Sequence, residues 1–255
     1  KGKKEDRRSI SWSDFWQGRR GEKLEGSFVL IRKKEIGKEP EQFWEAMNRY
    51  YGEKNCMVIY FYGVQDVVLL FFEGACLSGK DMDNLIQKEE CRYASQVIYD
   101  SGKYAGLEEM IGKFEDMLNL RFYHPEYRMM RLRNSSGERL DIDYEAFDVA
   151  LDDTDEDHYT ECIDKIWKPL LADEKYHGMI KQVFQSLILL IANKYTKYDI
   201  LIPGKLRQAL FPFAVSGYED RRELLQGLKE YAGELNTLAG EVMSRSELVD
   251  NVIWY

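Results

Sequence analysis

The hydrophobic periodicity of the chain changes near residue 134, and this change restricts the folds that the chain can adopt. Before this point, short runs of β-branched and aromatic residues alternate with segments of helical spacing, whereas after it only helical spacing is found. The polar stretch RNSSGERLD separates the two patterns. A chain of 255 residues can hold two domains of ordinary size. We therefore expect an α/β domain at 21–133 and an α-helical domain at 138–245.

The first of these domains is predicted to alternate strands and helices. The runs MVIYFY and VVLLFFEG flank the short turn GVQD, which predicts a β-hairpin. Pro40 suits the first position of a helix, Gly52 suits its C-terminal cap, and Asp81 is expected to be the N-cap of the next helix. The predicted order is β-α-β-β-α-β-α, with strands at 28–34, 57–62, 67–74 and 93–99 and helices at 40–52, 81–90 and 106–122.

The second domain is predicted to be helical throughout. Asp143 can cap a helix that ends near Leu151, and a later helix is expected at 173–198. This later helix is apolar over an arc too wide for a helix with one solvated side, so it is assigned to the core or to a dimer contact, with the core as the more common use. Its apolar residues include Val183, Phe184, Leu187, Ile188 and Ile191.

Both ends of the chain are interpreted as connections to other domains. The opening KGKKEDRR has no apolar rhythm, and residues 1–20 are expected to be a linker from an upstream domain. Near the other end, Ser246 is a suitable N-cap for a short helix, so 246–255 is expected to begin a truncated further domain. The apolar residues of that helix are Leu248, Val249, Val252 and Ile253.

The charge and the cysteine content exclude several classes of protein. A net charge of -9 provides no positive field for nucleic acid phosphates or an anionic membrane, so DNA is expected to be contacted only by residues outside the two domains. The 4 cysteines show no C-x-x-C spacing, which favours a reduced, cytoplasmic protein. The most apolar run, SLILLIA, is much shorter than the roughly 20 residues of a membrane span.

The segment from Gly74 to Asp81 fits the pattern G-x-x-x-x-G-K between a predicted strand and a predicted helix, where a phosphate-binding loop belongs. Such a loop needs a Ser or Thr hydroxyl for magnesium directly after the lysine, and this chain has the Asp81 carboxylate there. Helix capping is therefore the preferred interpretation of Asp81, and nucleotide binding by an enzyme is kept as an alternative.

An acidic run in the helical half has partial calcium-loop spacing. Asp153, Asp155 and Asp157 alternate, and Asp164 lies where the last acidic ligand would be. However, His158 takes the position where the sharp turn requires glycine, so an acidic helix start is the simpler interpretation. The histidines are far apart in sequence and lack metal-ligand spacing. We expect no catalytic site, no metal and no cofactor.

The order of the elements and the hairpin turn resemble the GGDEF and nucleotidyl cyclase group of folds, which are α+β and ferredoxin-like with an antiparallel sheet. In that group the turn reads G-G-[DE]-E-F, and acidic residues at its third position and at the end of the first strand bind the catalytic metals. In this chain the first strand ends in the basic residues 32–34. The resemblance implies a domain without catalysis, because a two-metal mechanism needs carboxylates. The corresponding turn residues are Gly63, Val64, Gln65, Asp66 and Val67.

A degenerate domain of this kind followed by helices is similar to the middle region of YesN-like response regulators of the AraC/XylS type, and to sugar-diacid-type regulators. In YesN-like proteins a receiver domain comes first and a helix-turn-helix pair comes last. The segments GLEEMIGKFEDMLNLRFYH and SELVDNVIWY contribute to the resemblance, and SELVDNVIWY is similar to the start of an AraC-type DNA-binding domain. The resemblance implies a non-catalytic segment that couples a receiver to a DNA-binding domain, with a homodimer as the transmitting unit. A small-molecule sensor of the same regulator is the second interpretation, because aromatic residues around the sheet could line an apolar pocket.

Overall fold

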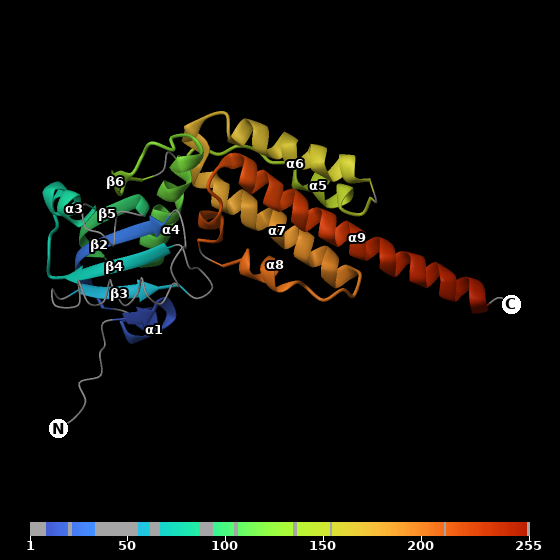
Figure 1. The fold of residues 1–255 in the computed structure, drawn as a ribbon, viewed down its shortest axis with the longest axis horizontal. Coiled ribbons are helices and arrows are strands. Elements are labelled where there is room, and N and C mark those ends of the chain that lie inside the picture. Colours follow the sequence, from blue (N-terminus) through green and yellow to red (C-terminus); the bar gives the residue numbers. More distant parts are fainter. Residues whose placement is uncertain are drawn as a thin grey trace, which may run out of the picture. The chain divides into compact units, whose positions relative to one another are not determined.

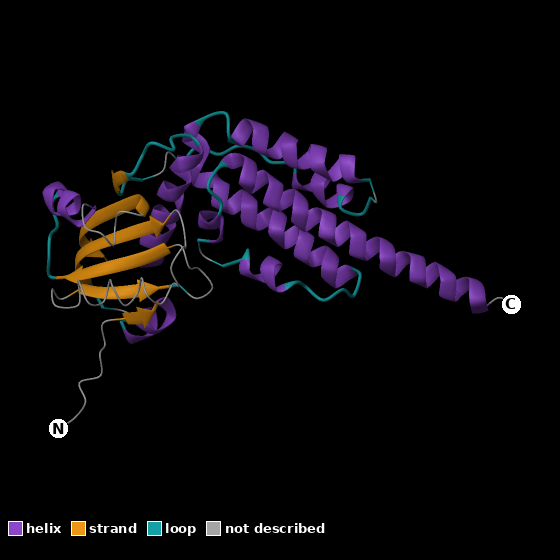
Figure 2. Ribbon diagram, viewed as in Figure 1, coloured by secondary structure: helices purple, strands orange, loops and turns teal. Residues whose placement is uncertain are grey.

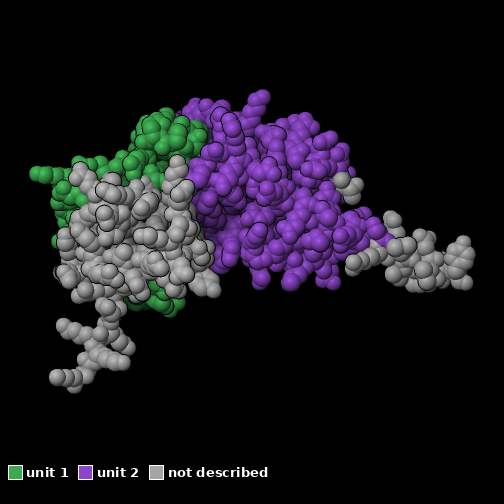
Figure 3. Space-filling model, in the orientation of Figure 1, with its two compact units in different colours: residues 1–135 green, residues 136–255 purple. Residues whose placement is uncertain are grey.

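The computed structural model of the chain is of the α+β class and divides into two compact units, residues 1–135 and 136–255 (Figures 2 and 3). No helix in the described part of the chain has both the length and the apolar character that crossing a membrane requires. The structure describes residues 9–19, 22–33, 56–61, 67–86, 94–104, 107–134, 137–153, 155–211 and 213–253.

The first unit is built on a mixed sheet that has six strands within the described residues (Figure 2). Its four inner strands, in the order β3-β4-β2-β5, are antiparallel to one another. The two edge strands, β1 and β6, run parallel to β3 and β5. The strands are β1 (Ser9–Ser11), β2 (Leu24–Lys33), β3 (Cys56–Tyr60), β4 (Val67–Glu73), β5 (Ala94–Tyr104) and β6 (Met129–Arg131).

The parallel edge strands correct the expectation of a wholly antiparallel sheet. β6 follows helix α4 (Leu107–Leu118) and the 3₁₀ turn η3 (Asn119–Phe122), which carry the chain back so that it re-enters the sheet in the direction of β5. The predicted hairpin is confirmed, because β3 and β4 pair directly, with Val58 opposite Leu70. The helix expected at 40–52 lies outside the described residues.

Both faces of the sheet are covered, which explains why Val67 to Phe72 on β4 are buried without alternation. On one face, Met82 of helix α3 (Gly79–Ile86) joins a core that includes Val29 and Leu70. Helix α4 packs against β5 (Figure 1). Burial on both sides produces a continuous apolar run in place of the alternation of a half-exposed strand.

The segment expected to be a linker contributes part of the first unit. Ser9–Ser11 pairs with β3, and helix α1 (Trp12–Gly18) follows at once, with the Ser11 hydroxyl accepting a hydrogen bond from the Asp14 backbone N–H. Phe15 of α1 is only 1% exposed and packs edge-on against Phe71 of β4, with 6.0 Å between the ring centroids. The apolar spacing in SWSDFWQG therefore marks a packed helix.

The second unit is helical, as predicted, and its long helices lie side by side in Figure 1. α9 packs against both α6 and α7. The helix expected at 173–198 is divided into a 3₁₀ turn and α7. The elements are α5 (Tyr144–Ala150), α6 (Glu156–Leu170), η4 (Glu174–Met179), α7 (Ile180–Lys197), α8 (Gly204–Gln208), η5 (Ala214–Gly217) and α9 (Arg221–Ile253).

One predicted boundary in this unit is wrong. The sequence predicts that Ser246 starts a new helix, but the helical backbone of α9 continues through it to Ile253. The residues on either side, Arg245 and Glu247, are good helix formers, and a single serine among such residues does not end a helix. Residues 246–253 therefore form the last part of α9.

Candidate functional site

Arg32, one of the basic residues at the end of the first predicted strand, lies beside two residues of the neighbouring inner strands. In the register of the sheet, Arg32 of β2 lies opposite Val67 of β4 on one side and opposite Gln96 of β5 on the other. We call these three residues the strand-end cluster. Of the five predicted turn residues, Val67 lies within the described part of the chain, and Gly63, Val64, Gln65 and Asp66 lie outside it.

The polar groups of the strand-end cluster are buried. The Arg32 side chain is 1% exposed, and its Nη1 donates a hydrogen bond to Ser95 Oγ over 3.0 Å. Ser95 Oγ in turn donates to the Arg32 backbone oxygen, which fixes the hydroxyl between the two strands. Gln96 is 2% exposed, and neither its side-chain nitrogen nor its oxygen has a hydrogen-bond partner among the described residues.

The chemistry of this cluster differs from that of a metal centre. Magnesium and calcium are held mainly by several carboxylate and carbonyl oxygens, whereas a guanidinium, an amide and an isopropyl group together offer one amide oxygen, that of Gln96, and no carboxylate. A guanidinium instead suits carboxylate or phosphate groups. Within the described ranges, no group of three or more His, Cys, Asp or Glu side chains is arranged to hold a metal ion.

The loop from Gly74 to Asp81 is tied down to the sheet through its own backbone. Ser27 Oγ on β2 donates to the Ala75 oxygen over 2.8 Å and accepts from the Leu77 N–H over 2.9 Å. Ser101 Oγ on β5 lies 2.6 Å from Ser27 Oγ. A phosphate-binding loop directs its backbone N–H groups toward the ligand, whereas the Leu77 N–H is already used within the fold.

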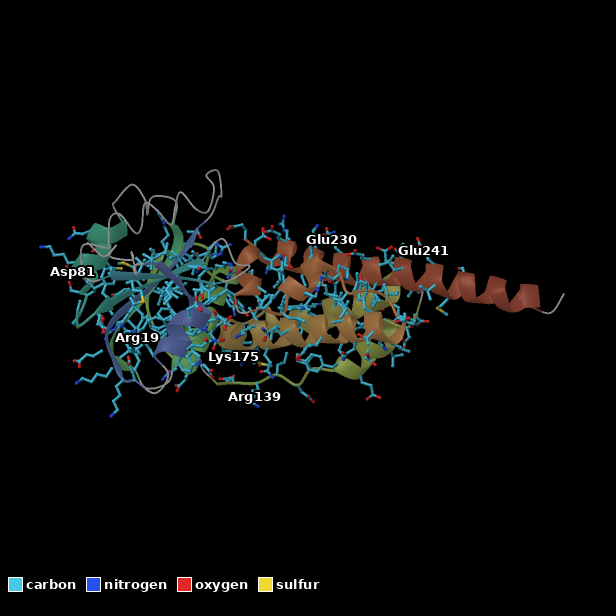
Figure 4. The ribbon with its side chains drawn as sticks, turned by 90° about the horizontal axis from the view of Figure 1, so that it is seen from below. Arg19, Asp81, Arg139, Lys175, Glu230 and Glu241 are labelled. Atoms are coloured by element: carbon cyan, nitrogen blue, oxygen red, sulfur yellow. The ribbon has the colours of Figure 1, made fainter. Side chains whose placement is uncertain are left out.

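Asp81, labelled in Figure 4, contributes to the start of α3 from the third position of the helix, not from the N-cap as predicted. Ser78 is the capping residue, because its Oγ accepts from the Asp81 N–H at 3.3 Å. The Asp81 carboxylate reaches back and accepts from the Ser78 N–H at 2.8 Å and from the Ser78 hydroxyl at 2.6 Å. These bonds, the hydroxyl first, hold the pKa of Asp81 below its usual value. This reciprocal pair is a capping box.

The acidic run is distributed over separate structural roles. Asp155 caps α6 by accepting from the Asp157 N–H at 3.0 Å, as an acidic helix start predicts. Asp153 lies 2.8 Å from Nδ1 of His158, and Asp164 forms an ion pair with Lys229 of α9 at 2.8 Å. The carboxylates therefore do not converge on one point.

The apolar residues named for the helix expected at 173–198 lie on α7 and are interior residues of the second unit. Each of them is 0% exposed, so their side chains are packed within the same chain. These residues are Val183, Phe184, Leu187, Ile188 and Ile191. The α9 residues Leu248, Val249, Val252 and Ile253 lie on the helical backbone of α9, and their side chains are outside the description.

A polar cluster between α5 and α7 was missed at the sequence level. Lys194 of α7 has a side chain only 7% exposed, and its Nζ lies 2.9 Å from Asp152 and 3.1 Å from Asp148. Asp152 also accepts from Lys197 at 2.8 Å and from the Tyr198 hydroxyl at 2.9 Å. A lysine within an apolar helix was the available signal, because buried lysines are almost always paired. We call these five residues the Lys194 cluster.

Comparisons of the chain with models of protein families, with curated proteins and with solved structures gave no match.

Proposed function

We propose that the chain is a non-catalytic, signal-transmitting segment of an AraC-type transcriptional regulator of the response-regulator class. In this proposal it couples an upstream receiver to a C-terminal helix-turn-helix domain through self-association. The first unit would be a degenerate GGDEF-like domain, and DNA would be contacted by the C-terminal domain alone. A signal would then act by favouring one of two arrangements of the dimer.

The arrangement of the inner strands supports a GGDEF-like assignment. β2, β3, β4 and β5 form an antiparallel block in which the first strand in sequence lies between the third and the fourth. α3 lies between β4 and β5 in the chain, where a β-α-β-β-α-β fold of the ferredoxin-like type requires its second helix. The first helix of such a fold would fall between β2 and β3, outside the described residues. This topology is an analogy of fold, which by itself does not establish a function.

The strand-end cluster is the single observation that carries the non-catalytic part of the proposal. Arg32 sits at the end of the central strand with Val67 and Gln96 as its neighbours in the register. A guanidinium has no oxygen that could bind a divalent cation, so Arg32 supplies no metal ligand at the place where a cyclase-type centre would need one. A nucleotide could not be activated there by the two-metal route.

The test is to incubate the purified chain with GTP and magnesium and to follow nucleotide turnover by chromatography, with isothermal titration calorimetry for binding. We expect no turnover. Measurable product would contradict the proposal, and loss of that product in Lys80→Ala would assign it to the loop from Gly74 to Asp81. Two helix-turn-helix units encoded directly after Tyr255 would support the regulator class, and an unrelated domain there would oppose it.

The second interpretation, a small-molecule sensor of the same regulator, is favoured by Gln96. A buried amide without a hydrogen-bond partner among the described residues is costly, and such groups are uncommon in folded proteins unless a bound group completes them. Thermal-shift measurements with a set of metabolites test this interpretation. We expect a ligand that stabilises the native chain to lose its effect in Gln96→Met, and a set without any stabilising ligand would count against the sensor.

A further inference from the structure

The apolar face of α9 continues beyond the helices that cover it. In the sequence of α9, a line of mainly apolar residues recurs at alternating steps of four and three positions, which is the spacing of the contact line, or seam, of a coiled coil. Its first part is buried in the second unit, with Leu228 and Ala232 at 0%, Leu235 at 1% and Ala239 at 7% exposure. The seam residues are Leu228, Ala232, Leu235, Ala239, Val242, Ser246, Val249 and Ile253.

The exposure changes at the next seam position. Val242 is 39% exposed and its neighbour Met243 is 47% exposed, although both are apolar. The length of the helices gives the reason. α9 has 33 residues and therefore extends about 50 Å, whereas its neighbour α7 has 18 residues and extends about 27 Å. Figure 1 shows the backbone of α9 running on past the other described helices of the second unit, and the spacing of the seam continues in its sequence.

Charges beside this part of the seam complement a second copy of the same helix. With Leu235 and Val242 at heptad position d, Arg245 takes position g and Asp250 takes position e of the next heptad. In a parallel pair of helices, each g residue lies opposite the e residue of the next heptad on the partner, so Arg245 would meet Asp250 twice by symmetry. Glu230 and Glu241, labelled in Figure 4, are exposed and lie outside the seam by the same count.

We propose that the C-terminal part of α9, from Val242 to Ile253, pairs with the same segment of a second copy as a parallel two-stranded coiled coil. This inference rests on the self-association in the proposed function and identifies the surface and the orientation. This segment is shorter than two heptads and forms a small interface, so the dimer is expected to be weak and to depend on concentration.

The test uses disulfide cross-linking of the full chain, because parallel pairing places each seam residue opposite itself. Cys76, which is exposed, and Cys91 are first replaced by Ser, and a single cysteine is then introduced by Val242→Cys or by Val249→Cys. We expect both variants to form covalent dimers under mild oxidation. Ser244→Cys, on the exposed outer side of the helix, is the matched control and should cross-link much less.

Variants that exchange these charges test the same pairing independently, with the dimer Kd measured by sedimentation equilibrium. Arg245→Asp and Asp250→Arg should each raise the dimer Kd roughly threefold to tenfold, since like charges then face each other, and the double variant should restore it. Cross-linking at only one of the two seam positions would indicate an antiparallel pair and would overturn the proposal, as would a strict monomer. GTP turnover tests the non-catalytic part of the proposed function in a separate assay. A failure of the coiled-coil pairing can therefore be distinguished from a failure of that function.

Discussion

At the scale of single residues, Asp152 shows how tertiary contacts change the chemistry of a side chain. Burial by itself raises the pKa of Asp152, but hydrogen bonds from Lys197, Lys194 and Tyr198 outweigh this effect and lower the pKa to about 2. A carboxylate with a lowered pKa stabilises the fold above its unfolded pKa of about 4, and this stabilisation is lost as the pH falls toward 2.

We therefore predict that Asp152→Asn lowers the free energy of unfolding at pH 7 by about 1 to 2 kcal/mol, since Lys194 then keeps only Asp148 as a charged partner among the described residues. The figure is modest because the Asp152 side chain is 38% exposed and solvent screens part of the interaction. Urea unfolding followed by circular dichroism measures the difference, which should shrink as the pH is lowered from 5 toward 2.5. Asp153→Asn, whose side chain is 59% exposed, is the control. A difference that stays constant with pH would contradict the assignment.

At the scale of elements, β1 and α1 show how a short segment becomes part of a larger sheet. Phe15 anchors this segment, because its ring packs on Phe71 and lies 6.0 Å from the ring of Trp12. Burial of a phenylalanine that is 1% exposed contributes far more than the three residue pairs of the short strand β1 could supply alone.

We predict that Phe15→Ala destabilises the first unit by about 3 to 4 kcal/mol, because it removes buried apolar surface and leaves a cavity above β4. Thermal or urea unfolding measures this loss, and hydrogen exchange should show faster exchange in β1 and β3. The exposed neighbour Gln17→Ala is expected to change stability by less than about 0.5 kcal/mol. Equal effects of the two substitutions would show that residues 9–18 act as a linker after all.

At the scale of the whole molecule, the charge of the chain decides which partners it can attract. A net charge of -9 opposes association with nucleic acid, whose affinity for proteins depends mainly on neutralised phosphates. The α+β unit and the helical unit are both included in this total.

We predict that the 255-residue chain does not bind duplex DNA at physiological salt. Fluorescence anisotropy with a labelled duplex, measured between about 50 and 200 mM salt, tests this expectation over the range in which phosphate contacts change affinity most. A longer polypeptide that includes a helix-turn-helix pair is the positive control. Salt-dependent binding by the chain alone would assign a DNA contact to one of its two units.

The local pattern of the sequence predicted several elements correctly because their signals are short-range. The paired runs around GVQD form the β3 and β4 hairpin, Asp143 caps α5 through the Ala146 N–H, and the apolar residues of α7 are interior. Periodicity and capping depend on residues three or four positions apart, so they can be read without the fold. The acidic start of α6 follows the same rule.

Other features were decided only by the tertiary structure. The burial of Phe15 depends on Phe71, 56 positions later in the chain, and the Lys194 cluster joins α5 to α7 across more than 40 positions. The mixed sheet also depends on long-range pairing, since β1 and β6 are each only three residues long and gain their strand conformation from neighbours. Sequence by itself determined where apolar and polar stripes fall on each element. Packing decided which stripes meet, because contact energies between distant residues are absent from any local pattern.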